Sequence, residues 1–63
     1  MKEKIYAVAI VLQQHNEKKI IQILRHGLFK APNSDQALGI AVSKFKEQDY
    51  SVALWDTIEV KDK

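Results

Sequence analysis

The sequence contains no cysteine, and only one proline and two glycines among 63 residues. Without cysteine the chain cannot form disulfides, thiolate zinc sites or a cysteine nucleophile. So few turn-forming residues indicate no linker, and 63 residues suffice for one small domain, 1–63. No apolar run approaches the ~18 residues of a membrane-spanning helix, so we expect no membrane partner.

The chain also has little excess of charge of one sign. Ten Lys and Arg stand against eight Asp and Glu, which leaves a net charge of only +2. Apolar residues make up 46% of the chain, a value typical of a globular protein. A domain of this size buries only about 60% of its unfolded surface. Because disulfides are excluded, we expect self-association to supply the missing stability.

The apolar run 5–12 follows Lys2 and Lys4, as in the first two parts of a secretory signal. The run is short for that purpose, and polar residues 13–16 follow it without a small-x-small cleavage pattern. Its β-branched residues favour a strand, and both of its faces are apolar, which is typical of a central strand covered on both sides. We therefore expect a strand in a cytoplasmic protein.

Hydrophobic periodicity predicts four elements: strands at about 4–14 and 18–30, a helix at about 34–48 and a strand at about 50–61. Pro32 ends the second strand. Asn33 or Ser34 caps the helix, and Gln36 has capping-box spacing from Asn33. Gly27 inside the second strand indicates a bulge or a close approach by another backbone. Asp56 interrupts the apolar positions of the last strand, which indicates a bulge or an exposed sheet edge.

This β-β-α-β order predicts an α+β domain with one helix packed on a three-stranded antiparallel sheet of strand order 2-1-3. One helix covers one face only. We expect the even positions of the last strand, from Val52 to Val60, to face the helix. The register of the hairpin stays open, and a slip of one residue would exchange the faces of a strand.

The uncovered face is the candidate functional surface. We expect an interface with a protein partner and with further copies of the chain, as a homodimer or larger oligomer, because so large an apolar face is rare on a monomer. The candidate interface residues are Val11, Ile21, Ile23, Arg25, Phe29 and Trp55. The alternative is a small nucleic-acid-binding protein that uses Arg25, Phe29 and Trp55 of the same face as a cation and stacking rings.

No catalytic or metal-binding pattern stands out. His15 and His26 lack further ligands at metal-binding spacing, and no Gly-x-Ser-x-Gly elbow or Gly-rich phosphate loop is present. The sequence therefore predicts a small accessory protein that is not an enzyme and has no cofactor and no metal.

Overall fold

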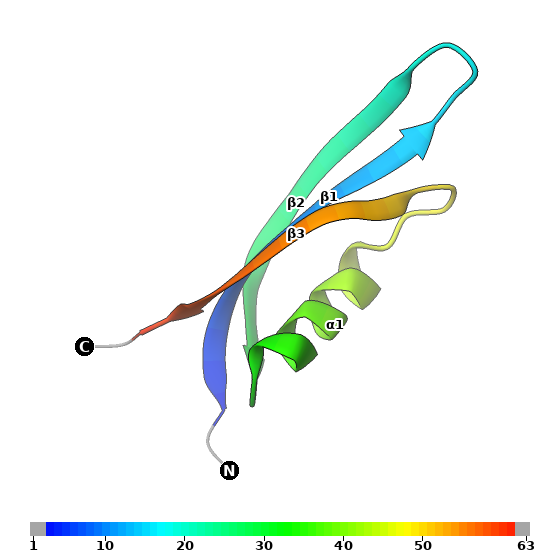
Figure 1. Ribbon diagram of the computed structural model, residues 1–63. Coiled ribbons are helices and arrows are strands. Elements are labelled where there is room, and N and C mark those ends of the chain that lie inside the picture. Colours follow the sequence, from blue (N-terminus) through cyan, green and yellow to red (C-terminus); the bar gives the residue numbers. More distant parts are fainter. Residues whose placement is uncertain (1–2, 62–63) are drawn as a thin grey trace.

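The computed structural model describes residues 3–61, which form a β-β-α-β domain (Figure 1). The elements are β1 (Lys4–His15), β2 (Ile20–Ala31), α1 (Ser34–Phe45) and β3 (Ser51–Val60). The strands form one antiparallel sheet in the order β2-β1-β3. This arrangement confirms the predicted α+β class, the single helix and the central position of the first strand.

The β1–β2 hairpin is long and regular. It pairs without a break from Lys4 opposite Ala31 to His15 opposite Ile20. The Asn16 N–H donates to the Lys19 carbonyl oxygen over 2.9 Å and closes the connecting turn. The length of this turn fixes the register, and it places odd-numbered residues of β2 beside even-numbered residues of β1.

Gly27 marks a close approach and not a bulge, because the β1–β2 register does not shift. The neighbours are aromatic rings rather than another backbone: a Cβ at Gly27 would lie 3.3 Å from the ring of Phe29 and 3.4 Å from the ring of Phe45. The two rings pack edge to face, with centroids 5.7 Å apart. Glycine at this position leaves room for that pair.

The bulge lies in β3. Leu54 pairs with Val11 and Val52 pairs with Leu12, so Ala53 is an extra residue in the strand. The extra residue reverses the alternation of side chains along the rest of β3. Val52 faces α1 as expected, but from Leu54 onward the even positions turn to the opposite face.

Helix α1 begins with the predicted cap: the Asn33 Oδ1 accepts a hydrogen bond from the Gln36 N–H over 2.9 Å. It ends at Phe45, three residues earlier than expected. The polar residues 46–48 would add no apolar side chain to the buried stripe, so nothing holds a further turn against the sheet. Asp49, with φ at 70°, then turns the chain into β3.

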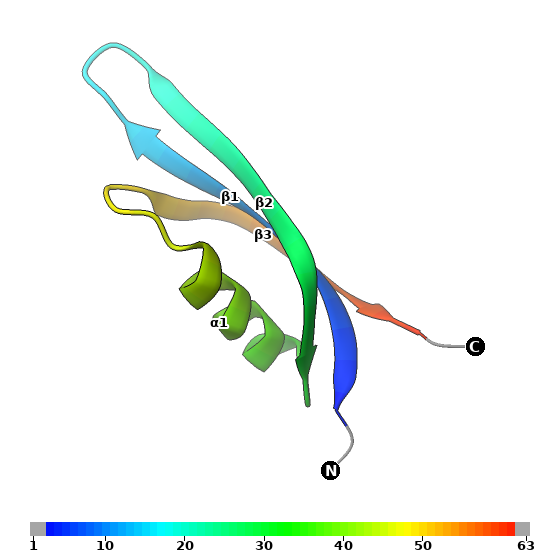
Figure 2. The same ribbon diagram turned by 180° about the vertical axis from the view of Figure 1, so that it is seen from behind.

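The core lies between α1 and one face of the sheet (Figures 1 and 2). Buried Tyr6, Val8, Ile10 and Leu12 project from β1, and buried Ala37 and Ala41 bring the helix close. Each fully buried aliphatic side chain stabilises the fold by about 1.5–3 kcal/mol. No described element covers the other face of the sheet, which we call the open face.

Candidate protein interface on the open face of the sheet

Strand pairing assigns the side chains to faces. Directly paired residues project from the same face, and the buried residues of β1 are even-numbered. The open face therefore comprises odd-numbered residues of β1, even-numbered residues of β2 and the even-numbered residues of β3 beyond the bulge. These are Ile5, Ala7, Ala9, Val11, Gln13 and His15 on β1, Ile20, Gln22, Leu24, His26, Leu28 and Lys30 on β2, and Leu54, Asp56, Ile58 and Val60 on β3, with Ser51 before the bulge.

The open face is apolar over most of its length. Leu28 and Leu54 are 67% and 65% exposed, on the two edge strands. Among residues 3–61, seven of the nine exposed large hydrophobic residues lie on this face: Ile5, Ile20, Leu24, Leu28, Leu54, Ile58 and Val60. The small side chains of Ala7 and Ala9 lie between the larger ones, so the middle of the face is hollow.

One polar row crosses the middle of this apolar surface. His26 on β2 and Asp56 on β3 both pair with Ala9, so they flank it on either side. A hollow of about 210 Å³ lies between Ala7, Leu28 and this row. A second hollow of about 130 Å³ lies on the other side of the row, beside Val11 and Leu54.

A hydrogen-bonded polar row bounds the apolar part near the hairpin turn. The Gln22 Nε2 donates to the Gln13 Oε1 over 2.8 Å, and the Gln13 Nε2 lies 2.8 Å from the His15 Nε2. The Ser51 hydroxyl adds a 3.4 Å contact to the Gln13 carbonyl oxygen. The open face therefore has an apolar centre and a hydrogen-bonded polar border near the hairpin turn.

The structure divides the six predicted interface residues between the two faces. Val11 lies on the open face, in the row of Leu24 and Leu54. The expected facing of the other five is wrong, since the pairing places Ile21, Ile23, Arg25, Phe29 and Trp55 on the helix side of the sheet. The hairpin turn sets the facing of the first four, and the bulge at Ala53 sets that of Trp55.

On the helix side these residues either pack against the core or lie exposed beside it. Ile23 and Phe29 pack against the core, and the Lys44 Nζ lies 5.9 Å from the centre of the Phe29 ring. Arg25 and Trp55 flank Ile10 on the two edge strands, and both are exposed. All five aromatic residues of the chain are therefore on the helix side, including Tyr6, Phe45 and Tyr50 of the core and its border.

Sequence reasoning missed Leu24, Leu28, Leu54 and Ile58 as open-face residues. Both faces of β2 carry large aliphatic residues, so composition could not show which face is covered. For β3 the signal was Asp56, which was expected to mark a bulge or an exposed edge. It lies exposed on an edge strand, three residues from the bulge.

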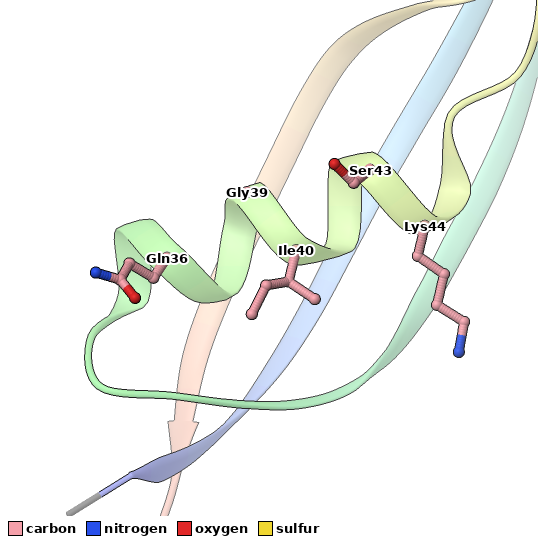
Figure 3. A pocket seen from close by; sticks show the side chains of 5 residues that line it. All are labelled: Gln36, Gly39, Ile40, Ser43 and Lys44. Atoms are coloured by element: carbon pink, nitrogen blue, oxygen red, sulfur yellow. The ribbon is translucent and has the colours of Figure 1, made fainter. Parts of the chain in front are cut away.

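A further hollow lies on the outer surface of α1 and is lined by Gln36, Gly39, Ile40, Ser43 and Lys44 (Figure 3). Ile40 is 45% exposed there, and nothing lies within 4 Å of a Cβ built at Gly39. Because one helix supplies every lining residue, this hollow is an open stretch of helix surface and not an enclosed pocket.

Among residues 3–61, no group of three or more His, Asp or Glu side chains is placed to hold a metal ion. None of the helices in that part of the chain is long and apolar enough to span a membrane. Comparison with known proteins finds no matching family model, no significantly similar curated protein and no significantly similar solved structure.

Proposed function

We propose that this chain is a non-enzymatic association protein of the cytoplasm, which self-associates and binds protein through the open face of its sheet. The observation that carries the proposal is the concentration of large exposed aliphatic residues on this face. A monomer rarely exposes a contiguous apolar surface of more than a few hundred Å². A dimer is the simplest assembly that covers the open face.

The bulge in β3 supports the same proposal. By reversing the alternation, the extra residue Ala53 moves Leu54, Ile58 and Val60 from the helix side to the open face. Three aliphatic side chains that stay in water contribute no burial free energy to the folding of an isolated domain. Burial of these side chains against another protein would supply that free energy.

The composition of the open face favours protein over nucleic acid as the partner. Among the described strand residues of the open face, Lys30 is the one lysine or arginine, and Asp56 lies near the middle of the face. Arg25, Phe29 and Trp55, on which nucleic-acid binding would depend, project from the helix side. Bases stack on aromatic rings, whereas aliphatic side chains suit a protein surface.

Sedimentation velocity over a range of concentrations tests self-association. We expect the unmodified protein to change from a 7.2 kDa monomer to a dimer as its concentration rises through the micromolar range. The double variant Leu54→Lys/Ile58→Lys places two charges in the apolar face, and we expect it to stay monomeric. Ile40→Lys is the matched control, since Ile40 is also exposed and aliphatic but lies on the outer surface of α1.

A particle of monomer mass at high micromolar concentration would contradict the proposal. Equal weakening by the open-face variant and by the control on α1 would assign the assembly to another surface. Binding of a single-stranded oligonucleotide at micromolar concentration and physiological salt, lost on Arg25→Ala, would support the nucleic-acid alternative instead.

A further inference from the structure

The two polar side chains at the centre of the open face differ in chemistry and lie on opposite sides of β1. His26 and Asp56 both pair with Ala9, from opposite sides of β1. Since neighbouring strands lie about 4.8 Å apart, the Cα atoms of His26 and Asp56 are roughly 10 Å apart. Among residues 3–61 neither side chain has a hydrogen-bond or ion-pair partner.

We propose, on the basis of the self-association proposed above, that the occupant of the open face is a second copy whose β1 runs in the same direction. The two-fold axis of this dimer lies between the two sheets, nearly parallel to β1, and passes over Ala9. Rotation about this axis exchanges the β2 side with the β3 side. His26 of each copy then faces Asp56 of the other, and the dimer gains two equivalent His–Asp pairs.

The alternative two-fold axis lies between the sheets but runs across the strands. When it passes over Ala9, that axis places β2 over β2 and β3 over β3, so His26 faces His26 and Asp56 faces Asp56. Two carboxylates directly opposed across an interface oppose association. Of the two arrangements centred on Ala9, the positions of these two residues therefore favour the parallel one.

The dimensions of packed sheets fit this arrangement. Sheets stack about 10 Å apart with their strands within about 30° of each other. Extended histidine and aspartate side chains together reach across such a gap to a hydrogen bond. The same rotation places Leu24 of each copy over Leu54 of the other, and Leu28 over Ile58, while Ala7 and Ala9 allow the sheets to approach closely.

The area of the interface indicates a weak dimer. Three strands with the spacing and rise of a β-sheet present a face of roughly 14 Å by 30 Å, so two faces together cover about 840 Å². This is below the roughly 1,200 Å² at which stable specific interfaces begin and is typical of weak, transient contacts, so we expect a dissociation constant no lower than the micromolar range. With so modest an apolar contribution, two His–Asp pairs have a measurable effect on affinity.

Cross-linking of single-cysteine variants tests the orientation, because the natural chain has no cysteine. The variants are His26→Cys, Asp56→Cys and, as a control on the outer surface of α1, Ser43→Cys. A short bis-maleimide is used, since facing residues about 10 Å apart are too distant for a disulfide. We expect an equimolar mixture of His26→Cys and Asp56→Cys to give a cross-linked dimer, and each variant alone to give little.

Efficient cross-linking of His26→Cys alone would overturn the parallel arrangement in favour of the crossed one. Equal cross-linking with Ser43→Cys would overturn it in favour of non-specific collision. A protein that sediments as a dimer but cross-links in another pattern would contradict only the parallel orientation. A protein that sediments only as a monomer would contradict both this orientation and the proposed self-association.

Discussion

The side chains of Ile10 and Trp55 lie opposite each other in the β1–β3 pairing and project from the helix side of the sheet. Ile10 is fully buried beneath α1, whereas Trp55, on the edge strand, is 60% exposed. The one tryptophan of the chain therefore lies on the opposite face from Leu54, its neighbour in sequence. This relationship separates the helix side from the surface on which the proposed assembly depends.

Alanine substitutions of the sequence neighbours Leu54 and Trp55 should differ in their effect on dimerisation. We expect Leu54→Ala to weaken dimerisation by about 1–2 kcal/mol, or roughly five- to thirtyfold in dissociation constant, because the side chain lies in the proposed contact. Trp55→Ala should leave the dissociation constant unchanged despite the larger side chain. Sedimentation equilibrium measures both, and a larger effect of Trp55→Ala would assign the contact to the helix side of the sheet.

Shortening Ile10 should destabilise the domain. Ile10 is completely buried between β1 and α1, so Ile10→Val leaves a small cavity and should lower the free energy of unfolding by about 1 kcal/mol. Ile40→Val makes the same chemical change at an exposed position of α1 and should have little effect. Urea denaturation at one fixed protein concentration measures the difference. Equal effects of the two variants would show that the position of α1 over Ile10 is wrong.

The two glycines should respond to alanine with opposite signs. Gly39 lies in α1 with nothing within 4 Å of its Cβ position, so Gly39→Ala should stabilise the domain by up to about 1 kcal/mol. Gly27→Ala would place its Cβ against the packed rings of Phe29 and Phe45, and we expect a loss of about 1 kcal/mol. Thermal unfolding followed by circular dichroism measures both. A stabilising Gly27→Ala would show that the ring pair has room to move.

The cap of α1 should depend on one side chain. Asn33→Ala removes the acceptor of the Gln36 N–H and should cost about 1 kcal/mol of stability. Asn33→Asp retains an acceptor and should preserve most of that stability, while Ser34→Ala, at the first helical residue, should change little. A greater loss with Ser34→Ala than with Asn33→Ala, measured by the melting temperature, would move the start of the helix by one residue.

Local chemistry was enough to predict the elements of this fold. The β-branched run of β1, the polar turn after it, Pro32 and the capping spacing from Asn33 to Gln36 each act over a few residues of the chain. The order 2-1-3 followed from connectivity and from the doubly apolar composition of β1, which suits the centre of a sheet. The helix followed in the same way from the hydrophobic period of the sequence, and its buried residues in the structure are Ala37 and Ala41.

Which residues face outward was decided by the tertiary structure. Both faces of β2 carry large aliphatic side chains, so only the pairing set by the hairpin turn distinguishes Leu24 and Leu28 from Ile21 and Ile23. In β3 the extra residue Ala53 reverses the alternation, which period-two reasoning cannot anticipate. The sequence by itself determined that one face of this sheet is left open. The strand register determined what that face presents, because a shift of one residue exchanges every side chain between the two faces.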